Sequence, residues 1–152
     1  MTGPRPPLSR KYRALAILLL PGNSLLTWLL RHGRAPRAFA LLETTGRRTG
    51  SPRYTCVGNG LTGETFWLVA AHGGQADWVR NIAADPAVRV LVHRAWRRGA
   101  AALLPNDDPV ARSHTLPHQW DAAIGRMIAT TPLTIRIDLE TDSEFRRPAR
   151  NE

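Results

Sequence analysis

The chain has 152 residues, of which 43% are apolar, and a formal net charge of +9. This length suits one domain with a sizeable core, and the apolar content excludes a disordered chain. Lys11 is the only lysine, so nearly all of the positive charge comes from arginine, which binds phosphate and carboxylate groups in a bidentate way. The charge predicts an anionic partner: nucleic acid, an acidic membrane surface or an anionic cofactor.

Cys56 is the only cysteine in the chain. An internal disulfide and a metal cage made of cysteines are therefore excluded, which fits a reducing compartment. We expect a cytoplasmic protein.

Two apolar segments with basic borders open the chain. Residues 10–20 and 24–33 read as helices that are separated at Pro21 and Gly22. The apolar run at 14–20 is too short to span a bilayer, which takes about 20 apolar residues. Two interpretations remain open: the helices cover a core, or they lie on an anionic membrane surface, at the inner face of the membrane.

The rest of the chain alternates between short strands and two helices. We expect strands at 38–45, 52–59, 65–71, 87–93, 96–104 and 132–140. We expect one helix at 77–85, with Asp77 as its N-cap, and another at 107–129, interrupted near Pro117. The first three strands should form a meander and the sheet should be antiparallel, which predicts an α+β protein with a closed or half-closed barrel.

Three glycines have the spacing of a dinucleotide-binding fingerprint: Gly58, Gly60 and Gly63. That motif binds a pyrophosphate when it leaves a strand and opens a helix. Here the strand pattern of 65–71 follows it, so we interpret the three glycines as part of a β-hairpin turn.

The sequence GRRTGSPR at 46–53 places Arg47, Arg48 and Arg53 in one short connection, with hydroxyl groups between them. Three like charges repel one another unless an anion or solvent screens them. The stretch is either an anion-binding loop or a solvated basic hairpin, and these residues alone leave both interpretations open.

A second stretch, at 70–81, joins small residues and a glycine pair to the start of a helix. A flat ligand can lie against such a backbone, and the amides of a helix N-terminus favour negative charge. Each of these residues also has an interpretation without a ligand. Trp78 could be a core residue, His72 a surface residue, and Asn81 could serve merely to hydrogen-bond the backbone.

His114 and His118 have a metal-ligand spacing, but Pro117 interrupts the helix and no third ligand is evident, so we expect no metal. We also expect no nucleic-acid partner, since neither an aromatic-basic strand nor a recognition helix is present in the sequence.

Three blocks carry a family resemblance: LLETTGRRTGSPRYTCV, FWLVAAHGG and DWVRNIAADPAVRV. In this order and at this separation they resemble the deazaflavin (coenzyme F420)-dependent nitroreductase family of split β-barrel oxidoreductases, over roughly residues 36–105. The resemblance implies an FMN-binding-like split barrel of mostly antiparallel strands with flanking helices. It also implies a helical, membrane-associated leader at 1–35, a cofactor-binding domain at 36–152, and a homodimer.

The resemblance further implies which residues bind coenzyme F420. The arginine loop would hold its phosphate and acidic tail, the end of the third strand would lie beside the deazaflavin ring, and the following helix would support that loop. The residues implied are Arg47, Arg48, Thr49, Arg53, Ala70, Ala71, His72, Gly73, Gly74, Trp78, Arg80 and Asn81.

By the same resemblance, the protein is a reductase that uses reduced coenzyme F420 to transfer a hydride to a small electron-poor acceptor: a quinone, a nitro compound or an activated alkene. His72 and His118 are the candidate proton donors. Relatives that reduce nitro compounds and quinones often have tyrosines over the ring in their C-terminal region. This chain has none there, since Tyr12 and Tyr54 are its only tyrosines. Two alternatives stay open: an FMN-binding split barrel, and a barrel without enzymatic activity that binds lipid or fatty acid.

Overall fold

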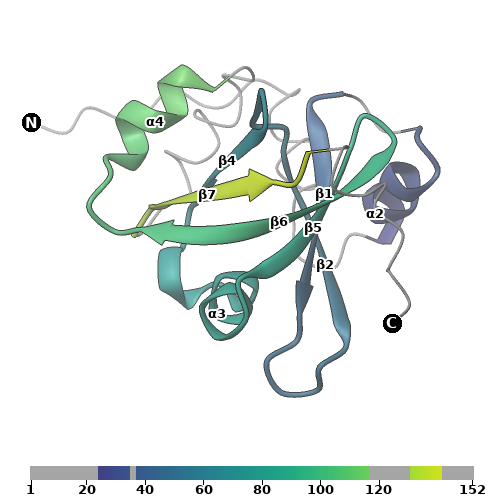
Figure 1. Cartoon of the computed structure of the whole chain (residues 1–152), viewed down its shortest axis with the longest axis horizontal. Coiled ribbons are helices and arrows are strands. Elements are labelled where there is room, and N and C mark those ends of the chain that lie inside the picture. Colours follow the sequence, from purple (N-terminus) through teal and green to yellow (C-terminus); the bar gives the residue numbers. More distant parts are fainter. Residues whose placement is uncertain (1–23, 35–36, 117–130, 142–152) are drawn as a thin grey trace, which may run out of the picture.

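The computed structural model describes residues 24–34, 37–116 and 131–141 (Figure 1). The helices are α2 (Ser24–Arg31), α3 (Asp77–Ala84) and α4 (Pro109–Thr115), and η1 (Gly73–Gln75) is a 3-10 turn. The strands are β1 (Phe39–Thr45), β2 (Pro52–Gly58), β3 (Leu61–Thr62), β4 (Thr65–Ala70), β5 (Ala87–Val92), β6 (Ala95–Leu104) and β7 (Leu133–Leu139). The six expected strands are confirmed, with ends that differ by one residue at most.

The strands form one seven-stranded sheet in the order β2-β1-β5-β6-β7-β4-β3, and neighbouring strands are antiparallel. The expected meander of the first three strands was wrong. β1 and β2 do form a hairpin, but β4 pairs with β7, with Trp67 opposite Arg136. Since β2 has a neighbour on one side only, it is an edge of the sheet.

The connection from β2 to β3 shows how strongly the sheet is curled. These two strands lie at opposite edges, yet only Asn59 and Gly60 separate them. Two linking residues let the chain advance about 11 Å at most, so the two edges must come close together. Gly60 is needed at this crossing, because a Cβ there would lie 1.8 Å from the carbonyl oxygen of Trp67. The fold is the expected split β-barrel.

The glycine spacing that resembled a dinucleotide fingerprint lies in this same region. Gly63 has a φ of +60° and begins the two-residue turn between β3 and β4, where Thr62 pairs with Thr65. The interpretation as a hairpin turn is confirmed, because a strand follows the glycines.

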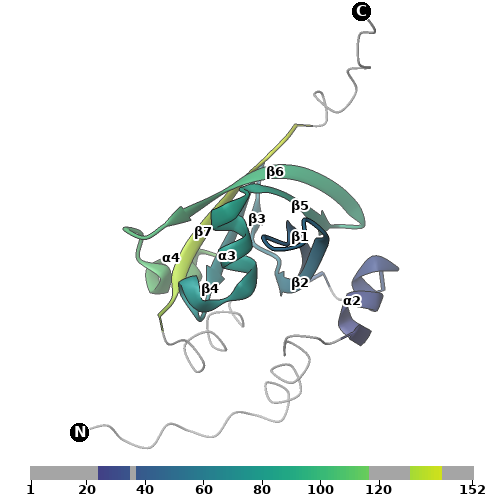
Figure 2. The ribbon, with the colours of Figure 1, turned by 90° about the horizontal axis from the view of Figure 1, so that it is seen from below.

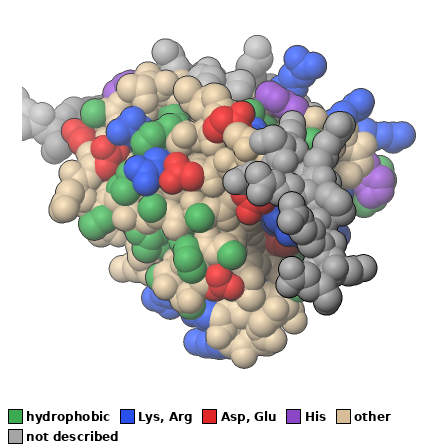
Figure 3. Space-filling view, viewed as in Figure 1, with side chains coloured by type: hydrophobic (Ala, Val, Ile, Leu, Met, Phe, Trp, Pro, Cys, Tyr) green, Lys and Arg blue, Asp and Glu red, His purple; other side chains and the backbone are tan. Residues whose placement is uncertain are grey.

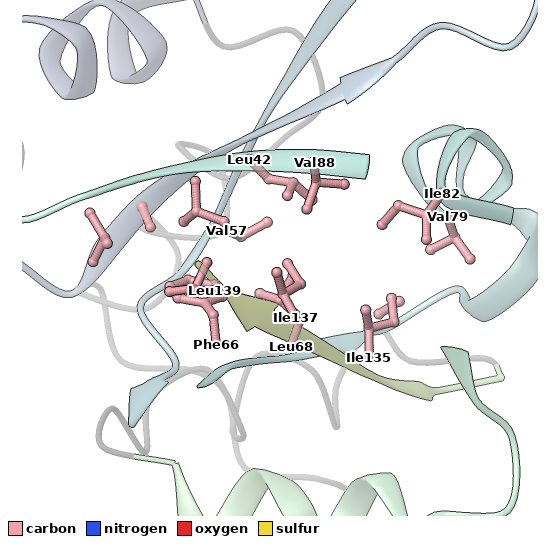
Figure 4. Packing of buried hydrophobic residues seen from close by; sticks show 14 residues of the cluster. Leu42, Val57, Phe66, Leu68, Val79, Ile82, Val88, Ile135, Ile137 and Leu139 are labelled. Atoms are coloured by element: carbon pink, nitrogen blue, oxygen red, sulfur yellow. The ribbon is translucent and has the colours of Figure 1, made fainter. Parts of the chain in front are cut away.

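The main core fills the inside of the curled sheet, and α3 closes its open side. Figure 2 shows α3 between β4 and β7 on one side and β1 and β2 on the other, with β5 and β6 arching over it. Val79 and Ile82 of α3 are buried in the same cluster as Leu42, Val57 and Ile135 of the sheet (Figure 4). Burial of these side chains fixes α3 across the barrel opening.

α2 packs on the outer face of the sheet. Its Leu30 is buried with Phe39, Leu41 and Leu91, which face away from the main core. Part of the segment expected as a leader therefore contacts the barrel. None of the helices among the described residues is long and apolar enough to cross a membrane.

Candidate functional site

The connection between β1 and β2 is a closed, hydrogen-bonded loop. The amide of Gly46 donates to the carbonyl oxygen of Ser51 at 2.8 Å, and the amide of Gly50 donates to that of Gly46 at 2.8 Å. Gly50 has a φ of +71°, a conformation that favours glycine. The tight loop brings the arginines near its tip and its base close together.

A cavity of about 310 Å³ lies between this loop and α3. We call it the arginine pocket; it is lined by Gly46, Arg47, Arg48, Thr49, Arg53, Thr55, Asp77, Trp78 and Asn81. In the view of Figure 3, arginine side chains gather at the lower edge of the molecule, near the place where Figure 1 shows α3 and the tip of the β1–β2 hairpin. The structure thus brings six of the residues expected at the cofactor into one pocket.

Sequence reasoning missed three lining residues: Gly46, Thr55 and Asp77. Two of them had a signal in the sequence. Thr55 lies two residues after Arg53 on a strand, so both side chains point to the same face. Asp77 lies four residues before Asn81, which places both on the same face of a helix.

Arg47 binds α3 through four hydrogen bonds. Its backbone amide donates to Asn81 Oδ1 at 3.2 Å, and its Nη1 donates to the same oxygen at 2.9 Å. Nη1 also donates to the carbonyl oxygen of Asp77 at 3.3 Å, and Nη2 donates to the Asp77 carboxylate at 3.0 Å. We call these three residues the Arg47 clasp.

Asn81 is the buried end of this clasp. It is only 5% exposed, and its Nδ2 donates to Thr44 Oγ1 at 3.4 Å, on the inner face of β1. Asn81 thus joins the arginine loop to α3 and to β1. The expected N-cap role of Asp77 was wrong, because α3 begins at Asp77 itself and its N-cap is Ala76, which makes no side-chain cap. The carboxylate pairs with Arg47 instead.

Arg48 and Arg53 differ from Arg47. Both side chains are exposed at the pocket, and neither guanidinium forms an ion pair or hydrogen bond with the residues that the structure describes. The Nε of Arg53 lies over the loop, 3.3 Å from where a Cβ of Gly46 would be. Two cations near one another without a carboxylate partner are suited to bind an anion.

The residues expected beside the ring lie in the connection from β4 to α3, outside the lining of the arginine pocket. Ala70 is buried at the end of β4, followed by Ala71 and the exposed His72. Gly73 is buried with a φ of +52°, and a Cβ there would lie 2.2 Å from the carbonyl oxygen of Thr131. Only glycine fits at this close approach.

Two hydrogen bonds hold that connection. Arg80 Nε donates to the carbonyl oxygen of Gly74 at 3.1 Å, and Thr131 Oγ1 donates to that of His72 at 3.3 Å. Arg80 thus contacts the backbone of the connection. α3 follows directly, so the connection and the arginine pocket share this helix. The second candidate proton donor, His118, lies outside the described residues.

The outer face of β1 braces the base of the arginine loop. Arg89 donates to both carboxylate oxygens of Glu43, at 2.8 and 2.5 Å, and lies over the Trp96 ring. The hydrogen bond from Arg89 holds the pKa of Glu43 below its usual range, although partial burial acts in the opposite direction. Thr44 faces the clasp while Glu43 faces Arg89, so both faces of β1 are fixed within its last three residues.

Solved structures with TM-scores above 0.5 support the fold, and a reductase is similar at a lower score. General Stress Protein 26 from Bacillus anthracis str. Sterne is 14% identical with a TM-score of 0.52, over 76% of this chain and 87% of that chain. A structure described as a domain-swapped dimer is 21% identical with a TM-score of 0.51, over 75% and 92%. An F420-H2 dependent reductase (FDR-A) is 22% identical with a TM-score of 0.48, over 68% and 95%.

The sequence itself gives the family. No curated protein matches the chain. The profile of the F420H(2)-dependent quinone reductase family matches residues 31–140, which is most of the chain and includes the arginine loop, the β4–α3 connection and all seven strands. The match confirms the resemblance to F420-dependent split barrels, and its description names quinones, which are one of the three acceptors that the resemblance implied. The chain belongs to the F420H(2)-dependent quinone reductase family, and it is a reductase that depends on reduced coenzyme F420.

Proposed function

We propose that the protein transfers a hydride from reduced coenzyme F420 to a quinone, and that the arginine pocket binds the phosphate of the cofactor. The observation that carries this proposal is the pair Arg48 and Arg53, which line one pocket without a carboxylate partner among the described residues. The family description supplies the quinone as the first acceptor to test. Nitro compounds and activated alkenes are the other electron-poor acceptors.

The donors of the pocket fit a phosphodiester followed by an acidic tail. The two guanidinium groups supply only hydrogen-bond donors, and the hydroxyl groups of Thr49 and Thr55 can each donate one more hydrogen bond to an anion. A volume of about 310 Å³ holds a phosphate group and part of its substituents. The pocket is open to solvent at the exposed loop residues, so a long acidic tail can continue out of it.

The reaction adds one hydride and one proton to a quinone, which becomes a quinol. Reduced coenzyme F420, when bound, supplies the hydride. The protein has to orient the reactants: Arg48 and Arg53 hold the anion, and α3 places the β4–α3 connection next to the pocket. At that connection Gly74 is exposed with open space where a Cβ would be, so a flat ring can approach the backbone there. His72, at the start of this connection, is the candidate to hold the proton; solvent is the alternative source.

A cofactor titration tests the proposal directly. Saturable binding of coenzyme F420 by fluorescence is expected, followed by oxidation of the reduced cofactor in the presence of a quinone. Titration with FMN in parallel tests the remaining cofactor alternative, because a phosphomonoester could also bind two arginines. Tighter binding of FMN than of coenzyme F420 would contradict the proposal. Family membership favours the enzyme over the lipid-carrying barrel, and co-purified fatty acid without hydride transfer would reverse that preference.

Contact with the inner face of a membrane is the second part of the proposal. Trp28 of α2 is 47% exposed and stacks on His32, while Arg31 and Arg34 next to it are exposed as well. Indole rings and arginines together favour an anionic lipid surface, and a quinone acceptor is itself apolar. Sedimentation with anionic vesicles and with neutral vesicles tests this: binding to the anionic ones only is expected, weakened in Trp28→Ser. The homodimer and the division of the chain at residue 35 stay predictions.

A further inference from the structure

We propose that the three arginines of the loop have two different tasks: Arg47 is a positioning residue that fixes the loop on α3, and Arg48 and Arg53 bind the anion. The nature of the anion rests on the proposed function. The division of tasks rests on hydrogen bonds within this chain, and it can be tested without any cofactor.

Three of the five N–H groups of the Arg47 guanidinium are already used within the chain. Nη1 uses both of its hydrogens, on Asp77 and Asn81, and Nη2 uses one on Asp77. The edge formed by Nη1 and Nη2, which would otherwise bind two oxygens of an anion, is therefore directed at the helix. The Arg47 side chain is only 23% exposed as a result.

The clasp also fixes the backbone of the loop. Asn81 Oδ1 accepts hydrogen bonds from the amide and from the side chain of Arg47, so one buried oxygen determines where this residue lies. Asn81 is held in turn by Thr44 on β1, which leads into the loop. Since Arg48 is the next residue, its position across the pocket depends on this contact.

The charges of the pocket divide in the same way. Arg47 and Asp77 form a pair with no net charge, whereas Arg48 and Arg53 keep theirs. An anion that approaches Arg47 also approaches the carboxylate of Asp77, which is 82% exposed and repels it. The attractive side of the pocket is therefore the side of Arg48 and Arg53.

Amide hydrogen exchange of the cofactor-free protein tests the positioning role. Arg47→Gln and Asn81→Ala should each raise the exchange of the loop amides at 46–51 by about tenfold or more, because the loop can then open without the clasp. Arg53→Ala should leave that exchange within about twofold of wild type. Arg136→Gln is the matched control, since Arg136 also pairs with an aspartate, at 3.2 Å, on the distant strand β7.

Binding of coenzyme F420 at low and high salt tests the other half. Arg53→Ala and Arg48→Ala should each raise Kd by about 10- to 100-fold and reduce its dependence on salt, since screened charge contacts are lost. The paired variant Arg47→Gln/Asp77→Asn removes no net charge. It should raise Kd but keep the salt dependence. If Arg47 only stabilised the whole fold, its substitution would lower the unfolding midpoint. The amides of the loop would then exchange no faster relative to the other amides of the chain than they do in wild type.

Two results would overturn the division of tasks. The first is unchanged loop exchange in Arg47→Gln and Asn81→Ala. The second is a paired variant that loses its salt dependence as fully as Arg53→Ala does, because Arg47 would then be a direct ligand of the anion. If the wild-type protein binds no coenzyme F420, the proposed function fails, while the exchange experiment still decides whether the clasp positions the loop.

Discussion

The arginines outside the pocket that have carboxylate partners differ in their surroundings from Arg48 and Arg53 of the pocket. Arg89 pairs with Glu43 and lies over Trp96, and Arg112 pairs with Asp107 and lies 4.0 Å from the Trp67 ring centroid. Both have a carboxylate and an aromatic face. Arg48 and Arg53 have neither among the described residues. The net charge of the chain does not distinguish these two groups, but their partners do.

The comparison indicates where positive charge contributes to stability and where it is available to a ligand. A paired arginine contributes through its carboxylate, its ring and its aliphatic stem. An unpaired arginine at a pocket is repelled by the neighbouring positive charges, which destabilises the fold. A bound anion offsets this repulsion. Substitutions in the two groups should therefore affect different measurements.

The largest effect is expected for Arg48→Ala/Arg53→Ala. Each charged hydrogen bond to the anion contributes about 1.5–3 kcal/mol, so the double variant should bind coenzyme F420 by about 3–6 kcal/mol more weakly. Its free energy of unfolding without cofactor should stay equal to that of wild type or rise, because a repulsion is removed. Fluorescence titration and urea unfolding give the two values. Unchanged affinity would mean that the loop is a solvated basic hairpin.

Features of the fold that depend on neighbouring residues were predicted from the sequence, whereas those that depend on residues far apart in the chain were not. Alternation of apolar and polar residues is local, and it located every long strand, including β5 and β6. The partner of β4 is β7, whose Ile135 lies opposite Leu68. That pairing depends on how the whole sheet curls, and no local pattern expresses it, so the meander was wrong.

Within the site, the sequence located the arginines and did not locate their partners. Asp77 was expected to cap α3, because an aspartate before an apolar helix usually does so. In the structure it is the first helical residue and pairs with Arg47, 30 residues earlier in the chain. Asp77 therefore forms an ion pair with a distant residue instead of a local helix cap. This ion pair is what distinguishes Arg47 from Arg48 and Arg53.

The second prediction concerns the paired group. In Glu43→Gln the carboxylate that binds Arg89 at two oxygens is lost, and the side chain is only 14% exposed. The free energy of unfolding should fall by about 1–3 kcal/mol. Urea unfolding at pH 7 measures this loss, and Glu140→Gln is the control, since the exposed Glu140 carboxylate forms no ion pair with the described residues. Equal stability of both variants would mean that the ion pair between Glu43 and Arg89 does not stabilise the fold.

The pH dependence of stability sharpens this prediction. The hydrogen bond from Arg89 lowers the pKa of Glu43 in the folded state, so the unfolded state binds a proton first as the pH falls. The contribution of the carboxylate is complete above the pKa of an unfolded glutamate, about 4.3, and is lost as the pH falls through the folded value. The difference in unfolding free energy between wild type and Glu43→Gln should therefore narrow from pH 5 to pH 3, in approximate numbers. A constant difference would assign the loss to packing instead.

The smallest effect is expected for Arg112→Met. Arg112 donates to both oxygens of Asp107 at 3.1 Å and lies over Trp67, which joins α4 to β4. Methionine keeps most of the apolar stem against the ring, so only the cation–π contact and a partly exposed ion pair are lost. The expected loss in unfolding free energy is about 1 kcal/mol or less. Because Arg112 is a paired arginine outside the pocket lining, the Kd for coenzyme F420 should not change. If Arg112→Met raised the Kd as much as Arg53→Ala does, a carboxylate partner would not distinguish structural arginines from arginines that bind the ligand.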